Sequence, residues 1–285
     1  GSGKTRTLTS RIVSVLEAGA VPRSILAITF TNKAAHEMRE RIASALPRAA
    51  ARDMFVGTFH ALGARFLRRL CGGLGRTPGF SIFDNGDSLR LLRAILKDPD
   101  LRPLVPKALG PVFFMRRISA LKNEVADPVP TPTLESLRLP ARLDSEMRRA
   151  QAGPAPGAAT ATDDRADALV RYIAAAYERA LVASNAFDFD DLIEKPVRAL
   201  RADSAALDAY RTAYRHIFVD EYQDINTAQY LLVSLLGSAH RNVSVVGDDA
   251  QAIYSFRGAD FRNFLNFDAD WPEAKTVLLE ENYRS

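Results

Sequence analysis

Five residues at the start of the chain have the types and order of a phosphate-binding loop. Gly3-Lys4-Thr5, preceded by Gly1 and Ser2, forms the second half of the pattern G-x-x-x-x-G-K-[ST], and apolar residues at helical spacing follow it. Glycine lets backbone N–H groups close around phosphate oxygens, and a helix N-terminus favours an anion. Lys4 would reach the β- and γ-phosphates of a nucleotide, and the Thr5 hydroxyl would hold Mg²⁺. The first glycine of the pattern is not in the sequence, so an ordinary turn or a cloning scar stays an alternative for this segment alone.

A second group, Asp220-Glu221, follows the apolar run HIFV (216–219), which has the composition of a buried parallel strand. The carboxyl ends of parallel strands converge on the ligand crevice of an α/β fold. One carboxylate there can hold Mg²⁺ through water, and the next can polarise an attacking water as general base. Two solvated acids at a strand end are the alternative. The loop and the acid pair together favour nucleotide hydrolysis.

The elements that must position these groups alternate between strand and helix in the first and last parts of the chain. Helices are expected at 4–18, at 33–46 and in a basic segment that ends near residue 70. Strands are expected at 24–30, 54–60, 216–221, 243–248 and 276–279. This alternation predicts an α/β fold with a parallel sheet and helices on both of its faces.

The middle of the chain breaks this alternation. Helical patterns at 87–96, 112–125 and 163–184 are separated by proline-rich connections, without a strong strand signal. The stretch AGPAPGAATAT (152–162) is low in complexity and is expected to be a mobile loop. The pattern predicts one α/β domain interrupted by a helical insertion.

Seven segments resemble, in order, the motifs of superfamily 1 DNA helicases of the UvrD/PcrA/Rep family. DEYQD (220–224) is similar to motif II of that family in its DExQD form. The other segments are GKTR (3–6) for motif I, TFTNKAA (29–35) for motif Ia, GTFH (57–60) for motif Ib, FDFDDL (187–192) for the return into the first motor domain, VGDDAQAIYSFRGA (246–259) for motif III and ENYRS (281–285) for motif IV. The resemblance covers both α/β parts and matches the middle part by position only. It implies a RecA-like P-loop NTPase sheet with an inserted helical subdomain.

The resemblance implies ATP and Mg²⁺ as cofactors. It makes Lys4 and Thr5 the ligands of the phosphates and Mg²⁺, Asp220 a second Mg²⁺ ligand and Glu221 the catalytic base. The full set of ATP-binding positions that it implies is Gly1, Ser2, Gly3, Lys4, Thr5, Arg6, Gln251, Tyr283 and Arg284.

Four of these positions have further implied roles. Gln251 would sense the γ-phosphate and couple it to the DNA site. Arg6 and Tyr283 would enclose the adenine ring between them. Arg284 would act as the arginine finger, a role in which a guanidinium on the transferring phosphoryl oxygens accelerates the reaction by orders of magnitude.

The resemblance also implies single-stranded DNA, and its junctions with duplex, as partners. The implied contacts follow three of the expected strands and are Phe30, Asn32, Thr58, His60, Tyr254, Phe256 and Arg257. Aromatic faces stack on any base, and Arg257 can hold phosphate, so the set would grip DNA without reading its sequence. Outside the motif context, Phe30 is equally explained as a core residue, and His60 is better explained by a structural hydrogen bond. Phe256 stands where well-known members carry Trp, which predicts a weaker grip.

The expected domain organisation follows from the same motifs. Residues 1–83 and 186–280 would form the two segments of a RecA-like domain 1A, and residues 84–185 a helical 1B-like insertion. Residues 281–285 would begin a second RecA-like domain. The sequence opens without methionine and stops within the motif IV pattern, so we expect a fragment of a longer protein.

Composition excludes several other classes of protein. The 285 residues are 47% hydrophobic and 25% charged, which is ordinary for a globular chain and excludes wholesale disorder. The single cysteine, Cys71, excludes an internal disulfide and a multi-cysteine metal site. No apolar run approaches the roughly 18 residues of a membrane span, and no signal peptide is recognisable, so no membrane partner and a cytoplasmic location are expected. The net charge of +4 permits a nucleic-acid partner but does not argue for one.

The function expected from these observations is an ATP-dependent DNA helicase that moves 3′ to 5′ along single-stranded DNA, in repair or replication restart, with repair or replication proteins as candidate partners. One alternative is a helicase–nuclease of the RecB/AddA type. Another is a module that only binds nucleotide and DNA. Because this family hydrolyses ATP between two RecA-like domains, we expect negligible DNA-stimulated ATPase from residues 1–285 alone.

Overall fold

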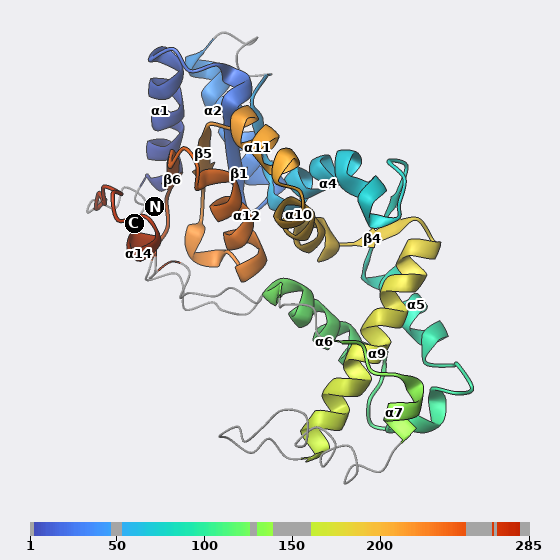
Figure 1. Cartoon of the computed structure of the whole chain (residues 1–285). Helices are drawn as coiled ribbons and strands as arrows, with labels where there is room; N and C mark the ends of the chain where they lie inside the picture. Colours follow the sequence, from blue (N-terminus) through green and yellow to red (C-terminus); the bar gives the residue numbers. More distant parts are fainter. Residues whose placement is uncertain are drawn as a thin grey trace. The chain divides into compact units, whose positions relative to one another are not determined.

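The computed structural model describes residues 3–46, 53–125, 130–138, 161–248, 264 and 267–279 (Figure 1). It divides into two compact units. The first consists of Gly1–Leu74, Asn123–Val125 and Asp191–Ser285, and the second of Gly75–Lys122 and Ala126–Asp190. The second unit therefore begins before residue 84 and ends after residue 185, the bounds expected for the insertion.

The first unit is built on a parallel sheet with the strand order β2-β1-β5-β6. Its strands are β1 (Ile25–Thr29), β2 (Phe55–Thr58), β5 (His216–Val219) and β6 (Val243–Val245). The register pairs Thr29 with Thr58 and Ile28 with Val219, so these strands end at the same edge of the sheet. The predicted parallel α/β architecture is confirmed, and Figure 1 shows helices on both faces of the sheet.

Alternation along β1 explains the two helical layers. Ile25 and Ala27 belong to one core cluster with apolar residues of α1 (Lys4–Glu17) and α2 (Asn32–Ala45). Leu26 and Ile28 belong to the opposite cluster. The helices that contribute to that cluster are α4 (Phe59–Leu70), α10 (Asp191–Ala202), α11 (Ser204–Ala213) and α12 (Thr227–Gly237). All four β1 residues are fully buried, as expected for a central parallel strand.

Side-chain caps fix the turns at the carboxyl edge of the sheet. The Thr31 hydroxyl accepts a hydrogen bond from Ala34 N at the start of α2, and the Thr58 hydroxyl accepts one from Ala61 N at the start of α4. Asn226 begins α12 with a reciprocal capping box. These helices thus start within a few residues of their strands or of the acid pair, which holds the intervening residues at this edge.

The second unit is mainly helical, as predicted. Its helices are α5 (Asn85–Ile95), most of α6 (Pro111–Glu124), α7 (Leu134–Arg138) and α9 (Ala161–Ala183). Its core includes the fully buried side chains of Leu92, Phe114, Ile173 and Leu181. A parallel pair not anticipated from the sequence, β3 (Ser81–Phe83) with β4 (Ala186–Asp188), joins the two ends of this unit. That pairing is why the unit extends beyond the expected bounds.

Short elements complete the described chain. These are the 3₁₀ turns η1 (Pro22–Ser24), η2 (Cys71–Leu74), η3 (Arg102–Leu104) and η4 (Tyr222–Asp224), and the one-turn helix α14 (Phe267–Asp270). None of the helices in the described ranges is long and apolar enough to cross a membrane.

The strand expected at 276–279 is wrong. Residues 274–279 have no regular secondary structure, and Val277 and Leu278 are each 76% exposed. An apolar run forms a strand only where a neighbouring strand binds its N–H and C=O groups, and the described residues of the sheet pair with one another instead. Of the expected loop at 152–162, residues 152–160 lie outside the described residues, and the last two begin α9.

Candidate nucleotide-binding site

The N-terminus of α1 forms one side of the candidate site. Gly3 is the N-cap, with φ 78° and ψ 11°, a left-handed conformation that glycine adopts without steric cost. Lys4 and Thr5 follow in the first turn. The first N–H groups of a helix have no partner within the helix, so this turn offers donors to an anion. Gly1 and Ser2 lie outside the described residues.

The end of β5 brings Asp220 to this turn. Its backbone N–H donates to the Ile28 carbonyl at 2.9 Å, which continues the β1–β5 pairing beyond the strand. Thr5 Oγ1 donates a hydrogen bond to Asp220 Oδ2 at 3.0 Å. The two residues predicted to share Mg²⁺ therefore touch, although they are 215 positions apart in the chain.

Asp220 is 4% exposed, and this burial raises the pKa of its carboxyl group. The neighbouring Glu221 charge raises the pKa further, whereas the Thr5 hydrogen bond and the Lys4 charge lower it. The net effect is upward, so the surrounding protein does not fully compensate the buried negative charge. A divalent cation at this position would supply that compensation.

Glu221 lies beyond Asp220 in a left-handed conformation, with φ 52° and ψ 47°, which is uncommon for a residue with a side chain. Its carboxylate Oε2 lies 4.0 Å from Lys4 Nζ and accepts a hydrogen bond from Gln223 Nε2 at 2.9 Å. The side chain is 36% exposed. Water can therefore reach the carboxylate, as a general base requires.

Asp248 and Gln223 are site residues that the sequence reasoning did not single out. Lys4 Nζ donates to Asp248 Oδ2 at 2.7 Å, and Asp248 N donates to Gln223 Oε1 at 3.1 Å. Both residues stand within the segments that resemble motifs II and III, which was the available signal. Spacing along the chain does not reveal which side chains meet across the ends of two neighbouring strands.

This arrangement fits a Mg²⁺–nucleotide. Phosphate oxygens can replace the carboxylate of Asp248 on Lys4, and a hydroxyl and a carboxylate are the oxygen ligands that Mg²⁺ takes alongside phosphates and water. Across the described ranges no group of three or more His, Cys, Asp or Glu side chains is arranged to hold a metal ion. That absence agrees with an ion held by one or two protein oxygens and the substrate. When bound, Mg²⁺ neutralises charge on the transferring phosphoryl group.

The remaining predicted ATP-binding residues are only partly described. Arg6 is exposed in the first turn of α1. Gln251, Tyr283 and Arg284 lie outside the described residues, so their roles stay predictions.

Four predicted DNA contacts lie at the carboxyl edge where β1 and β2 end. Half-buried Phe30 and exposed Asn32 follow β1. Thr58 ends β2 and uses its hydroxyl to cap α4, in whose first turn His60 is half-buried. The structure brings these four to neighbouring strand ends, and Tyr254, Phe256 and Arg257 lie outside the described residues.

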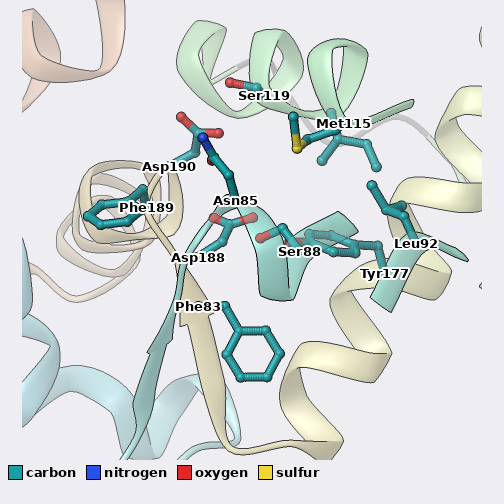
Figure 2. A pocket seen from close by; sticks show the side chains of 11 residues that line it. Phe83, Asn85, Ser88, Leu92, Met115, Ser119, Tyr177, Asp188, Phe189 and Asp190 are labelled. Atoms are coloured by element: carbon teal, nitrogen blue, oxygen red, sulfur yellow. The ribbon is translucent and has the colours of Figure 1, made fainter. Parts of the chain in front are cut away.

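The second unit contains a small cavity that does not suit a nucleotide. Figure 2 shows its lining, which combines aromatic side chains such as Phe83 and Tyr177 with polar groups such as Asp188. Its volume of about 30 Å³ holds about one or two water molecules, whereas ligand pockets measure about 300–1,000 Å³. Asp188 pairs with Lys122 at 2.7 Å, with both side chains 11% exposed, so its buried charge is already compensated.

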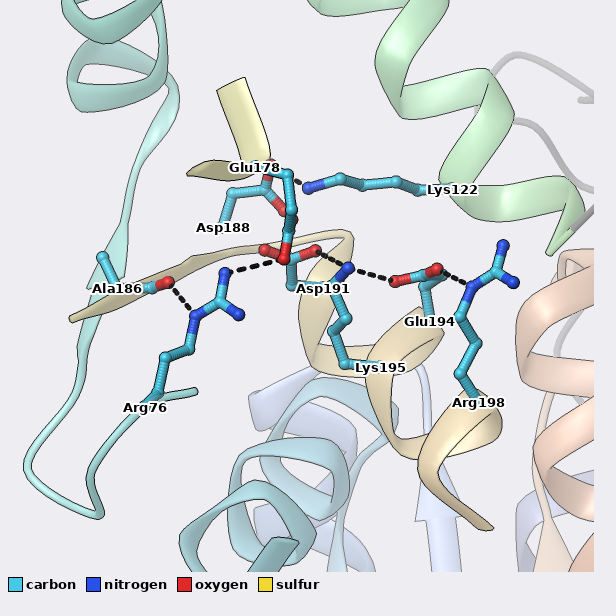
Figure 3. A network of polar contacts seen from close by, with 9 residues as sticks. All are labelled: Arg76, Lys122, Glu178, Ala186, Asp188, Asp191, Glu194, Lys195 and Arg198. Atoms are coloured by element: carbon cyan, nitrogen blue, oxygen red, sulfur yellow. Dashed lines mark hydrogen bonds and ion pairs between the residues drawn. The ribbon is translucent and has the colours of Figure 1, made fainter. Parts of the chain in front are cut away.

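Buried carboxylates also mark the point where the chain returns to the first unit, at the segment FDFDDL. Asp191 and Glu194, in the first turn of α10, are 0% and 3% exposed. Lys195 lies 3.9 Å from Asp191 and 3.3 Å from Glu194, and Arg198 also pairs with Glu194 (Figure 3). Acids in a first helical turn with cations one turn later stabilise the helix start, so we read this group as structural.

The fold and the site together define a class of protein. A parallel sheet whose carboxyl edge carries a GKT helix N-terminus and an Asp–Glu pair is a RecA-like P-loop motor domain. The chain belongs to the UvrD/REP helicase family, because residues 1–272 match the UvrD/REP helicase N-terminal domain.

Relatives with this domain are similar along the whole chain. Over 286 aligned positions, covering 100% of the chain, it is 40% identical to the ATP-dependent DNA helicase PcrA of Bacillus subtilis (strain 168) and 40% identical to PcrA of Staphylococcus aureus (strain Mu50 / ATCC 700699). It is 39% identical to PcrA of Leuconostoc citreum. The chain spans about a third of the length of these relatives, 34–35%.

Proposed function

We propose that this chain is the nucleotide-hydrolysing part of an ATP-dependent DNA helicase that moves 3′ to 5′ along single-stranded DNA and separates duplexes. The proposal rests chiefly on one observation, the contact of Thr5 with Asp220 beside Lys4 and Glu221 at the carboxyl edge of the sheet. The name of the PcrA relatives, ATP-dependent DNA helicase, supports ATP and DNA as substrates. We place the activity in the cytoplasm, in DNA repair or replication restart.

In the proposed reaction, Lys4 binds the β- and γ-phosphates, and Thr5 and Asp220 hold Mg²⁺. Glu221 accepts a proton from the water that attacks the γ-phosphorus, while the bond from the γ-phosphorus to the bridging oxygen of ADP breaks. Lys4, 4.0 Å from the Glu221 carboxylate, keeps that carboxylate near the phosphates. The product of this step is ADP and inorganic phosphate.

Further residues complete the proposal from the motif resemblance. Gln251 senses the γ-phosphate, and Arg284 stabilises its charge during transfer. Arg6 and Tyr283 enclose the adenine ring. DNA lies along the residues at the ends of β1, β2 and β6, which are Phe30, Asn32, Thr58, His60, Tyr254, Phe256 and Arg257.

A second candidate is a module that binds nucleotide and DNA without turnover, and the length of the relatives favours it for residues 1–285 by themselves. In this family the hydrolytic cleft lies between two RecA-like domains, and the chain spans 34–35% of the relatives. We therefore propose negligible DNA-stimulated ATPase for this segment alone. A nuclease domain elsewhere in the full protein would indicate a helicase–nuclease.

Strand displacement by the full-length protein tests the proposal. Duplexes with a 3′ or a 5′ single-stranded overhang, each with a fluorophore–quencher pair, report unwinding with and without Mg²⁺–ATP. We expect ATP-dependent separation of the 3′-tailed duplex only, and none by Lys4→Ala. Separation of only the 5′-tailed duplex would reverse the polarity, and ATP hydrolysis without any separation would reduce the protein to a translocase.

A further inference from the structure

Gln223 connects the acid pair after β5 to the end of β6. It lies in η4, two residues beyond Glu221, and is 2% exposed. Its side-chain amide makes two hydrogen bonds, one to the Glu221 carboxylate at 2.9 Å and one from the Asp248 backbone N–H at 3.1 Å. A buried amide that bonds the expected base on one side and the neighbouring strand end on the other has a place in the site that packing alone does not explain.

The orientation of this amide is fixed by its two partners. A backbone N–H can only donate, so the Gln223 oxygen must face Asp248 N. A carboxylate can only accept, so the Gln223 nitrogen must face Glu221. Neither bond survives a flip of the amide.

The backbone around this amide is adapted to it. Tyr222 N donates to the Val246 carbonyl at 2.9 Å, which ties the turn after β5 to the chain that follows β6. A Cβ atom added at Gly247 would lie 3.0 Å from the Gln223 oxygen, so a side chain there would crowd the amide. The left-handed backbone of Glu221 turns the chain so that residues 221 and 223 face each other.

We propose that Gln223 is a positioning residue for ATP hydrolysis, holding the Glu221 carboxylate where it takes the proton of the attacking water. Glu221 is 36% exposed and has several rotatable bonds, so without this bond its carboxylate samples other positions. Because the same amide binds Asp248 N, a shift of the segment after β6 is transmitted to the base. The inference rests on the proposed function, since Glu221 must be the base for its position to matter.

Substitution of Gln223 should separate turnover from nucleotide binding. Gln223→Met keeps the side-chain length and removes both hydrogen bonds, and Gln223→Glu keeps an acceptor for Asp248 N but sets a carboxylate against Glu221. In the full-length protein with saturating single-stranded DNA, we expect both variants to lower kcat roughly 10- to 100-fold. The Kd for a fluorescent ATP analogue should change less than about twofold, because Lys4, Thr5 and Asp220 keep their contacts.

A double substitution tests whether Gln223 acts through Glu221. If it does, Glu221→Gln combined with Gln223→Met should be no slower than Glu221→Gln alone, because residues that act as a unit are strongly non-additive. Multiplying losses would overturn the proposal. So would a Gln223→Glu variant with the kcat of the wild type.

Gln229→Met is the matched control, because Gln229 is also buried, at 5% exposed, and uses its amide to cap α12. It should lower the Tm and leave kcat within about twofold of the wild type. If Gln229→Met lowers kcat as much as Gln223→Met does, Gln223 is only a structural residue.

A readout without turnover separates failure of this inference from failure of the proposed function. The infrared difference between wild type and Glu221→Gln isolates the carboxylate band of Glu221, and the same difference in the Gln223→Met background isolates it without the amide donor. We expect the band to move between the two backgrounds, and an unmoved band overturns the contact. A wild-type protein without ATPase but with a moving band would overturn the proposed function and leave the contact established.

Discussion

At the scale of single residues, the site is organised around a cation with two acidic neighbours. Lys4 lies 2.7 Å from Asp248 and 4.0 Å from Glu221, and its side chain is 13% exposed. An ammonium group held in this way is already ordered before an anion arrives, which reduces the side-chain entropy lost on binding. Phosphate oxygens then take the place of the Asp248 carboxylate, so nucleotide binding exchanges one anion for another on the same cation.

The Thr5 hydroxyl provides the sharpest residue-scale prediction. Thr5→Val keeps the shape of the side chain but removes the donor to buried Asp220, and we expect the affinity for Mg²⁺–ATP to fall about 10- to 100-fold. Titration with a fluorescent ATP analogue, with and without Mg²⁺, measures the change. Thr7→Val, at an exposed position of the same helix, is the control and should bind as the wild type does. Equal binding by both variants would exclude Thr5 as a ligand.

Sequence reasoning found the charged groups of this site but not their partners. A GKT at a helix start and a DE pair after an apolar run identify Lys4, Thr5, Asp220 and Glu221 because each type has few other uses at such places. Gln223 is an amide two positions further on, and nothing in its type or spacing reveals a partner at the end of β6. The contact depends on the strand order, which brings β6 beside β5.

At the scale of elements, a proline and a glycine allow α10 to pack closely on α4. Pro196, inside α10, has no N–H to bond the Leu192 carbonyl four residues earlier. That carbonyl lies against Gly63 of α4, where an added Cβ atom would lie 1.6 Å from the Leu192 oxygen. The helix behind the predicted DNA contacts Thr58 and His60 is thus held by a backbone approach that only glycine permits.

Gly63→Ala should therefore be strongly destabilising. The new methyl group meets backbone atoms, so α4 and α10 must separate, and we expect a loss of about 3 kcal/mol or more in the free energy of unfolding. Chemical denaturation monitored by circular dichroism measures it. Gly72→Ala, in η2 with no atom within 4 Å of the added Cβ, should change stability by less than about 0.5 kcal/mol. A stable Gly63 variant would contradict the close approach of the two helices.

Two histidines beside the sheet predict a pH dependence of stability. Burial lowers the pKa of His216 and of His240, and neighbouring arginines, including Arg215, lower both further. His240 Nδ1 also accepts a hydrogen bond from Asn242 N, which requires an unprotonated nitrogen.

A histidine whose pKa is lower in the folded state binds its proton more readily when unfolded. The stabilisation is therefore complete above a pH of about 6.5 and is lost as the pH falls through this value toward the folded-state pKa. We expect the Tm to fall between about pH 7.5 and 5.5, and the fall to be smaller in a His216→Gln/His240→Gln variant. His36→Gln, at an exposed position of α2, is the control and should keep the wild-type slope. Identical slopes in all three proteins would contradict this assignment.

At the scale of the whole molecule, the alternation of strand and helix was sufficient to predict a parallel sheet with an insertion, because buried strands and amphipathic helices have distinct periodicities. It was not sufficient for the strand expected at 276–279, since a strand depends on a neighbour that local sequence does not contain. It also missed β3 and β4, whose three-residue segments are too short for a periodic signal and join only across the whole second unit.

The bounds of the two units have the same explanation. Composition changes near residues 84 and 185, where loops give way to helices, but the units divide at 74/75 and 190/191, where contacts divide. Residues 123–125 belong to the first unit although they continue α6, and Asn123 accepts a hydrogen bond from Asn226 at the start of α12. Long-range contacts of this kind are invisible to a pattern along the chain.

The central claim is that Lys4, Thr5, Asp220 and Glu221 hydrolyse ATP in a motor driven along DNA. The most direct test is the steady-state ATPase rate of the full-length protein with and without single-stranded DNA, beside Glu221→Gln. We expect DNA to raise the rate at least about tenfold, and the variant to lose about 100-fold or more while still binding the nucleotide. Turnover that is indifferent to DNA, or a Glu221→Gln variant as active as the wild type, would contradict the account.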